Sequence, residues 1–289
     1  MKKTTIAIII LLLLCGCSDR NADIAATTGP VYQFTGMLCE GTGLTVAQVV
    51  TEPVSCLHDY TLTVSQMKLI ENAQVVVISG AGLEEFLEDI LDEKSVIDAS
   101  SQAQLLESSG HSHEEHGDHA HEHAHEHDPH IWLSPANAAA MARQIGAELT
   151  ERYPQYRDIF AHNLEALLLQ LDRLAQYGQA QLSGLSCREL ITFHDGFAYL
   201  AHSYDLHILE AIEEESGSEA SAKELMQLIS LVRTHKLPAI FTEVNGSSSA
   251  ADVICRETGI GSFSLSMAMT EDYFTAMYRN FDILKEALQ

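Results

Sequence analysis

The sequence contains few basic residues. Only 16 of its 289 residues are lysine or arginine, against 41 aspartates and glutamates, so the formal net charge is −25. A surface of this sign repels nucleic-acid phosphates and anionic membrane surfaces, which argues against nucleic acid as a partner. The acidic excess by itself indicates a solvated surface with only a weak and unselective attraction for cations.

Several motifs of enzymes and of cysteine-based metal sites are missing. The chain has no nucleophile elbow and no phosphate-binding glycine loop. Four of its six cysteines follow the N-terminal region, at positions 39, 56, 187 and 255, and none of their spacings is C-x-x-C. In an oxidising compartment these four allow three sets of disulfide pairs. We favour Cys39–Cys56 with Cys187–Cys255, because each bridge then stays within one part of the fold.

The N-terminus resembles a bacterial lipoprotein signal. Two lysines precede an apolar stretch at 6–14 that is too short to be a stable membrane anchor. Gly16 then precedes Cys17, as in a lipobox, in which the cysteine carries the lipid. We expect removal of residues 1–16, lipidation of Cys17 and a flexible tether at 17–30. The alternative is an ordinary secretory signal with an incidental cysteine; either way the mature protein works outside the cytoplasm, at the cell surface or in the periplasm.

Two parts of the chain alternate short apolar runs with helical patterns. In the first part, residues 74–79 and 95–98 are predicted strands on either side of a helix at 83–91. In the second part, the pattern predicts strands at 189–193, 207–212, 239–242 and 263–266, and helices at 196–204, 220–235, 248–258 and 273–288. Continuous apolar runs are typical of parallel sheets that are buried on both faces. The sequence therefore predicts two α/β lobes, at 31–152 and 184–289, with parallel sheets flanked by helices.

A long helical stretch lies between the two lobes. Ser134 is a suitable N-cap and Pro135 a suitable first residue for a helix that runs to about residue 152. Pro154 interrupts the pattern, and apolar residues then recur at spacings of three and four up to residue 182. A helix of that length is roughly 40 Å long, so we expect residues 153–183 to be a single rigid helix that joins the lobes.

A histidine-rich loop interrupts the first lobe at 107–127. It has no aliphatic side chain larger than alanine, so it cannot bury a core, and we expect it to be mobile. Neutral imidazole binds zinc well, but a tract without fixed geometry binds metals loosely and with poor selectivity. This accessory role is assigned to His111, His113, His116, His119, His121, His123, His125 and His127.

Three other histidines stand in segments that are not of low complexity. His194 directly follows the strand at 189–193, and ligands of open α/β sheets bind beyond the carboxyl ends of the strands. His58 stands in a loop before a predicted helix at about 63–72. His130 ends the histidine-rich run, but it stands in DPHIWLSP, beside the only tryptophan and a helix start. These three are the candidate ligands of a folded metal site.

The motifs together resemble those of the substrate-binding lipoproteins of zinc-type ABC importers, in the group with two α/β lobes joined by one rigid helix. The resemblance covers residues 31–289. It rests on these segments: the HDY triplet at 58–60, the histidine-rich loop, DPHIWLSP at 128–135, FHDGFAYLAHSYDL at 193–206, SAKELMQLISLVRTHKLPAIFTE at 221–243 and the closing MYRNFDILKEAL.

The resemblance implies a function in zinc uptake. It implies that Zn(II) is the transported ligand and is bound between the lobes by His58, His130 and His194. It also implies a monomer without catalytic residues, which delivers the ion to an ABC permease driven by its ATPase. The histidine-rich loop would then raise the local zinc concentration or sense excess zinc.

The fourth metal ligand is the point at which the chain departs from the family pattern. Some relatives place a carboxylate ligand after the last strand, but here residues 264–269 read SLSMAM, with no acid before Glu271. We expect three imidazoles and a water molecule. Glu243, at the end of the strand AIFT, is either the fourth ligand, a hydrogen-bond partner of a ligand histidine, or a solvated acid at a strand end. Three neutral imidazoles favour Zn(II) over manganese or magnesium.

Two other functions remain compatible with these residues. Three histidines and a water also form the zinc site of some hydrolases. A formal HExxH occurs at 121–125, but in a repeat of His, Glu and Ala such a match arises from composition alone, and no apolar helix face supports it. The second alternative is a metal-storage or adhesion lipoprotein that acts through its histidine tract.

Overall fold

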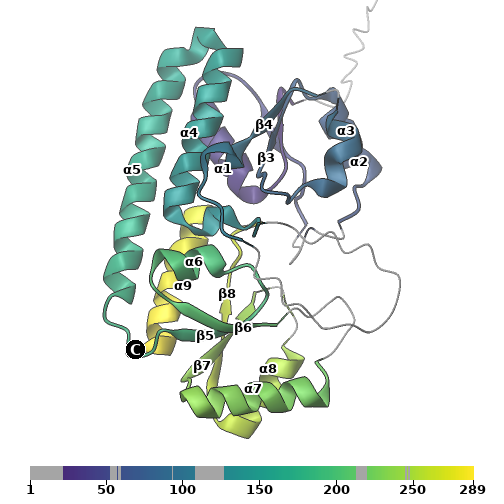
Figure 1. Cartoon of the computed structure of the whole chain (residues 1–289). Helices are drawn as coiled ribbons and strands as arrows, with labels where there is room; N and C mark the ends of the chain where they lie inside the picture. Colours follow the sequence, from purple (N-terminus) through teal and green to yellow (C-terminus); the bar gives the residue numbers. More distant parts are fainter. Residues whose placement is uncertain are drawn as a thin grey trace, which may run out of the picture.

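Two α/β lobes are stacked along one long helix, as Figure 1 shows. The computed structural model describes residues 22–52, 57, 60–92, 94–107, 127–212, 220–244, 246 and 248–289. In these residues each lobe contains a four-stranded parallel sheet, in the order β2-β1-β3-β4 in the first lobe and β6-β5-β7-β8 in the second. The fold class predicted from the sequence is confirmed.

The first lobe is built around the strand β3 (Val75–Ile78), which pairs with a strand on each side. Its run of four β-branched residues fits a strand that is covered on both faces. The other strands are β1 (Ile24–Ala26), β2 (Val46–Gln48) and β4 (Val96–Asp98), and the helices are α1 (Gly29–Cys39), α2 (Val64–Asn72) and α3 (Glu88–Leu91). A capping box between Thr63 and Gln66 starts α2.

The second lobe repeats this arrangement. Its most buried strand is β7 (Ala239–Glu243), which lies between β5 and β8 and has all five residues buried. The other strands are β5 (Glu189–Phe193), β6 (His207–Ala211) and β8 (Gly261–Leu265), and the helices are α6 (Ala198–Ser203), α7 (Ala222–His235), α8 (Ser249–Thr258) and α9 (Tyr273–Leu288). Because all strands are parallel, the loops that follow them meet at one edge of the sheet.

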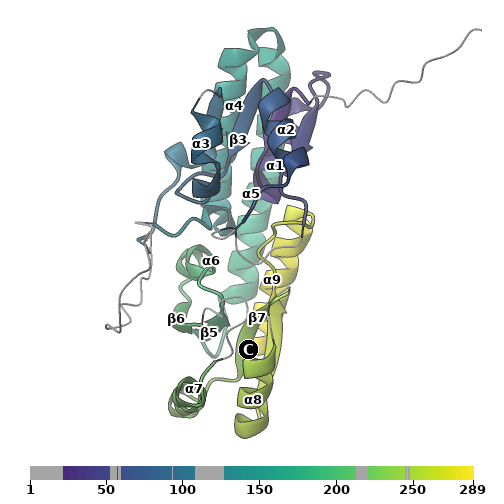
Figure 2. The same ribbon diagram turned by 90° about the vertical axis from the view of Figure 1, so that its right-hand side faces the viewer.

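The helices α4 (Pro135–Arg152) and α5 (Arg157–Leu182) form the connection between the lobes. Ser134 caps α4, with its hydroxyl accepting from the backbone N–H of Asn137. A 3₁₀ turn that begins at Pro154 separates the two helices. Figure 2 shows α5 passing behind both lobes, and it packs against α1 and α4 in the first lobe and against α9 in the second. The predicted long helix is therefore present, with its first turn as 3₁₀ helix.

A set of contacts fixes one lobe against the other. Gln33 of α1 donates to the backbone carbonyl of Glu271 and accepts from the backbone N–H of Tyr273, both at 2.8 Å. The ring of Tyr273 packs edge-on against Phe34, with ring centroids 5.0 Å apart. Its hydroxyl donates to the carbonyl oxygen of Trp132 at 2.8 Å. One hydrophobic core contains buried residues of both lobes, so the lobes are packed together rather than loosely hinged.

The expected tether at 17–30 is wrong for its second half. Residues 24–26 form β1, which lies inside the sheet between β2 and β3 and is fully buried. Pro30 stands in the first turn of α1, a position where its missing N–H costs no hydrogen bond. Small residues and one proline look like a linker in composition, but here they build the centre of the first lobe. That lobe therefore begins by residue 22 rather than 31, while residues 1–21, with Cys17, lie outside the described part.

Two smaller expectations also differ from the structure. The helix predicted at 83–91 is present only as a 3₁₀ turn (Glu85–Leu87) followed by the single turn of α3. Cys39, Cys187 and Cys255 are free thiols, so the favoured disulfide pairs are not formed. The prediction rested on an even cysteine count, and a count says nothing about whether two Cβ atoms approach closely enough for a bridge. Cys56 lies outside the described residues.

A buried glutamate organises the edge of the first sheet. The carboxylate of Glu84 accepts hydrogen bonds from the hydroxyl of Thr27 and from the backbone N–H groups of Ser79 and Gly80, at 2.6 to 2.9 Å. Complete burial is the main cause that raises the pKa of this carboxyl to about 7. The side chain thus ties the end of β1 to the turn after β3. None of the described helices is long and apolar enough to cross a membrane.

Candidate metal centre

His130 is held in place by a buried carboxylate. Asp128 Oδ1 lies 2.9 Å from the backbone nitrogen of His130 and 2.8 Å from its Nδ1, and both residues are 5% exposed. The Asp128 carbonyl accepts from the hydroxyl of Tyr199, and the ring of Trp132 packs against the His130 imidazole. A carboxylate acceptor at Nδ1 places the proton on that nitrogen, which leaves the Nε2 lone pair free to bind a metal ion.

The second lobe brings His194 to the same place. His194 follows β5 at the carboxyl end of the sheet, and its Nε2 lies 3.3 Å from Nε2 of His130. The two rings are nearly perpendicular, at 84°, with centroids 5.1 Å apart. Zinc bonds imidazole nitrogen at about 2.0–2.1 Å in a tetrahedron, and two such ligands stand about 3.3 Å apart. The distance between these two nitrogens is therefore compatible with one tetrahedral zinc ion, and it also lies within hydrogen-bond range.

The third predicted ligand, His58, lies outside the described residues. Its described neighbours are well anchored: Leu57 is buried, and the Tyr60 hydroxyl donates to Glu52 and accepts from Gln66. Among the described residues, no group of three His, Cys, Asp or Glu side chains is arranged to hold a metal. The structure thus shows two of the three expected imidazoles together, and it does not bring Glu243 into one group with them.

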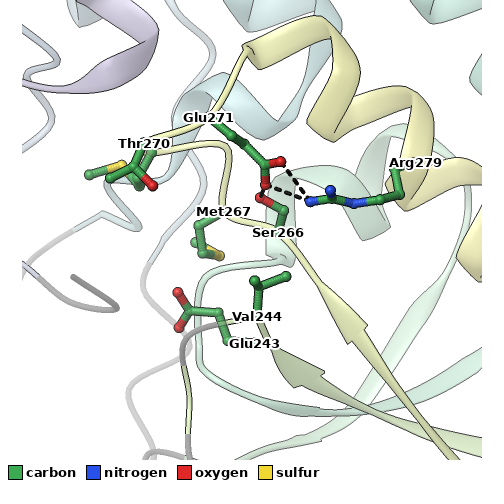
Figure 3. Close-up of a pocket in the computed structure, with 8 residues that line it drawn as sticks. Glu243, Val244, Ser266, Met267, Thr270, Glu271 and Arg279 are labelled. Atoms are coloured by element: carbon green, nitrogen blue, oxygen red, sulfur yellow. Dashed lines mark hydrogen bonds and ion pairs between the residues drawn. The ribbon is translucent and has the colours of Figure 1, made fainter. Parts of the chain in front are cut away.

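Glu243 is buried at the carboxyl end of β7. It is 4% exposed, and burial without a compensating hydrogen bond from the described residues raises the pKa of its carboxyl to about 8. A solvated strand-end acid is therefore not what the structure shows. Its side chain lines a cavity of about 220 Å³, which Figure 3 shows in close-up. The lining residues are Glu243, Val244, Ser266, Met267, Met269, Thr270, Glu271 and Arg279.

The loop after β8 closes this cavity and is held from both lobes. Asn280 accepts from the backbone N–H of Ser266 and donates to its carbonyl, and Arg279 pairs with Glu271. The Trp132 indole donates to the backbone carbonyl of Met267 at 2.8 Å. Met267 was not among the ligands predicted from the sequence, which were histidines and acidic residues. It belongs to the segment SLSMAM, in which no acid precedes Glu271.

The other histidines stand apart from this centre. His162, His202, His207 and His235 are exposed, and His235 pairs with Glu189 on the surface at 3.0 Å. His127 pairs with Glu107 in an isolated antiparallel bridge, which brings the two ends of the histidine-rich loop together. Eight histidines of that loop are predicted to bind metal weakly. Seven of them lie outside the described residues, and His127 is the eighth.

The chain is similar in sequence to proteins that are named for zinc binding or zinc uptake. Residues 24–287 match the family model of ZnuA, described as the periplasmic component A of a zinc-uptake complex. The chain is 30% identical over 314 residues to the zinc-binding lipoprotein AdcA of Streptococcus pneumoniae serotype 4. That match covers 99% of this chain but 61% of AdcA, so the chain spans about three fifths of that relative's length.

Solved structures are similar over nearly the whole described chain. A crystal structure of ZnuA has a TM-score of 0.79 and 29% sequence identity, covering 93% of this chain and 99% of the other. The Zn(II)-bound ZnuA-like domain of Streptococcus pneumoniae AdcA has a TM-score of 0.77 and 26% identity, covering 93% and 99%. Both likenesses include the two lobes and the helix between them.

Proposed function

Because the chain belongs to the family of zinc-uptake complex component A, periplasmic, we propose that it captures Zn(II) between its two lobes and delivers the ion to an ABC import permease. The permease would be driven by its ATPase. The chain would act as a monomer outside the cytoplasm, held at the membrane by a lipid on Cys17, and it would carry out no catalysis. The names of its relatives, a zinc-binding lipoprotein and a zinc-uptake component, support this assignment.

The observation that carries the proposal is the distance of 3.3 Å between Nε2 of His130 and Nε2 of His194. The two imidazoles come from different lobes, and only His194 is partly exposed. His58 would complete the set of three imidazoles, and water or Glu243 would take the fourth position. Three neutral imidazoles favour zinc over manganese and magnesium, which prefer oxygen ligands.

The architecture suits capture of a small ion rather than of a large solute. Because the lobes share a core and are joined by α5, they can move only modestly relative to each other. A site for one ion needs no larger motion to open or close. The histidine-rich loop leaves the first lobe just before Asp128, within a few residues of His130. That position suits a loop that gathers ions and passes them to the centre.

The proposal is tested by zinc affinity in chelator competition. We expect one tight site per wild-type chain, lost in His130→Ala and in His194→Ala and kept in His162→Ala, which changes an exposed histidine on α5. Deletion of residues 110–127 should leave that one tight site. If the deletion removes tight binding, the protein acts through its histidine tract, as a storage or adhesion lipoprotein would.

A hydrolase is distinguished by turnover. Ester or peptide hydrolysis by the zinc-loaded chain that disappears in His194→Ala would replace the transport proposal with an enzymatic one. Uptake is tested separately in cells. Zinc accumulation should depend on this chain and on the His130 imidazole, and a chain with His130→Ala should fail to restore it.

A further inference from the structure

The methyl end of a methionine side chain lies near the ligand nitrogen of His194. Gly196 shows this, because a Cβ atom placed on it would lie 2.5 Å from Cε of Met267 and 2.9 Å from Nε2 of His194. Cε of Met267 and Nε2 of His194 are both close to this one position, so the two atoms are neighbours. Met267 is 3% exposed, so its sulfur lies inside the protein and not at the surface.

The backbone of Met267 is held rigidly from both lobes. Its carbonyl accepts from the indole of Trp132, whose ring also packs on the ligand His130. The next residue, Ala268, has a positive φ of 56° and donates its N–H to the Ser266 hydroxyl. Side chains other than glycine rarely adopt this conformation, and it persists where the surroundings fix it. The thioether is therefore presented by a fixed support, as a ligand of a selective site must be.

A buried carboxyl lies next to Met267. Glu243 lines the same cavity as Met267, and Figure 3 shows the two side chains next to each other at the ends of β7 and β8. Residues 264–269 contribute no acid. The lining of this cavity thus holds two thioethers, of Met267 and Met269, and two carboxyls. Glu271 is paired with Arg279, and burial disfavours the charged form of Glu243.

We propose that Met267 determines the metal selectivity of this centre, with its thioether as a ligand that admits monovalent copper as a second cargo and disfavours Mn(II). The proposal deepens the zinc-binding function and rests on the same two imidazoles. Thioether and imidazole ligands suit Cu(I), imidazole suits zinc, and carboxylates and water suit manganese. A carboxylate at this position would reverse the preference toward manganese.

The first test is a comparison of Met267→Leu with wild type and with Met141→Leu. Leucine keeps the volume of methionine and removes the sulfur, and Met141 is a fully buried methionine of α4 that lies outside the centre. Affinities for Zn(II) and, under anaerobic reducing conditions, for Cu(I) are measured by competition with chromophoric chelators. We expect Met267→Leu to weaken Cu(I) binding at least tenfold more than Zn(II) binding, and Met141→Leu to change neither.

A second measurement reports on the sulfur directly. In protein labelled with ¹³C at the methionine methyl groups, the Met267 signal is identified by its absence in Met267→Leu. Addition of one equivalent of Cu(I) should shift this signal selectively, and Mn(II) should bind Met267→Asp at least tenfold more tightly than wild type. A Met267 signal that Cu(I) leaves in place, with equal Cu(I) affinity in wild type and Met267→Leu, would overturn the proposal.

Failure of the zinc-binding function and failure of the role of Met267 give different results. Loss of the zinc-binding function would appear as no tight zinc site in the wild-type chain. The copper measurements do not depend on that result, since they compare Met267→Leu with Met141→Leu for Cu(I) alone. A chain that binds zinc tightly, with Cu(I) affinity unaffected by Met267→Leu, would keep the proposed function and exclude the role of Met267.

Discussion

Removal of the Asp128 carboxylate should weaken zinc binding without removing a ligand. Oδ1 of Asp128 accepts from both the backbone N–H and the Nδ1–H of His130, so this one oxygen fixes the orientation of the ring and the position of its proton. In Asp128→Ala the imidazole can rotate, and it can carry its proton on Nε2, the nitrogen that must bind the metal. Loss of such a supporting carboxylate typically reduces metal affinity about 10- to 100-fold.

The structure predicts different losses of zinc affinity for two variants of Asp128, both within this 10- to 100-fold range. Asp128→Asn can keep an acceptor oxygen at the Oδ1 position, because two N–H groups point at it, while its NH₂ takes the place of Oδ2. Oδ2 is buried and has no partner among the described residues, so this change loses charge but little geometry. We expect about tenfold weaker zinc binding for Asp128→Asn, or about 1.4 kcal/mol, and about 100-fold for Asp128→Ala.

The assay is chelator competition at constant pH and ionic strength, with circular dichroism to verify folding. Glu189→Gln is the matched control, because Glu189 also pairs with a histidine, His235, but on the exposed surface. It should leave zinc affinity within twofold of wild type. If Asp128→Ala bound zinc as tightly as Glu189→Gln while His130→Ala lost tight binding, the Asp128 carboxylate would have no role in positioning the ligand.

Three further perturbations test the fold and the chemistry of the site. Burial raises the pKa of Glu84 to about 7 from the usual 4.5, so the stability that its protonated form contributes is complete below about pH 4.5 and is lost as pH rises through 7. The free energy of unfolding in urea should therefore fall over this window by about 3 kcal/mol less in Glu84→Gln than in wild type. A Cβ on Gly178 would lie 2.5 Å from the Tyr204 hydroxyl and 2.8 Å from Phe281, so Gly178→Val should destabilise the chain by about 1–3 kcal/mol in denaturant titration. Zinc affinity should fall as pH drops below roughly 6.5, since each imidazole must be neutral to bind, and an affinity that is flat between about pH 5 and 8 would contradict three histidine ligands.

Elements with local signals were predictable from the sequence. The helix α4 begins at Pro135 after its Ser134 cap, and α9 follows Asp272, whose carboxylate accepts from the N–H of Thr275. Both helices were placed at their observed bounds because capping residues and apolar periodicity are properties of neighbouring residues. The strand β5 was equally clear, as a short run of buried residues before a histidine.

Elements that depend on distant partners were not predictable. β1 consists of one isoleucine and two alanines, and only its hydrogen bonds to β2 and β3 make it a strand. For the site, the sequence indicated that His130 and His194 are ligands, but 64 residues separate them, and only the fold sets their nitrogens 3.3 Å apart. Met267 stands in no ligand motif, and only the fold brings its methyl group close to His194.

The same short loop both joins the lobes and faces the metal centre, and this limits how the ion can leave. A wide opening of the lobes would break the bonds of Gln33 to the loop before α9, the bond from Trp132 to Met267, and the packing of Tyr273 on Phe34. Each hydrogen bond contributes only about 1 kcal/mol, but buried groups left without partners cost more. In the proposed function, release would therefore need only a small shift of one imidazole away from the other, because two nitrogens bound to one tetrahedral zinc ion stand about 3.3 Å apart. The proposed permease would supply that shift at the His194 loop, since His194 is the partly exposed member of the pair.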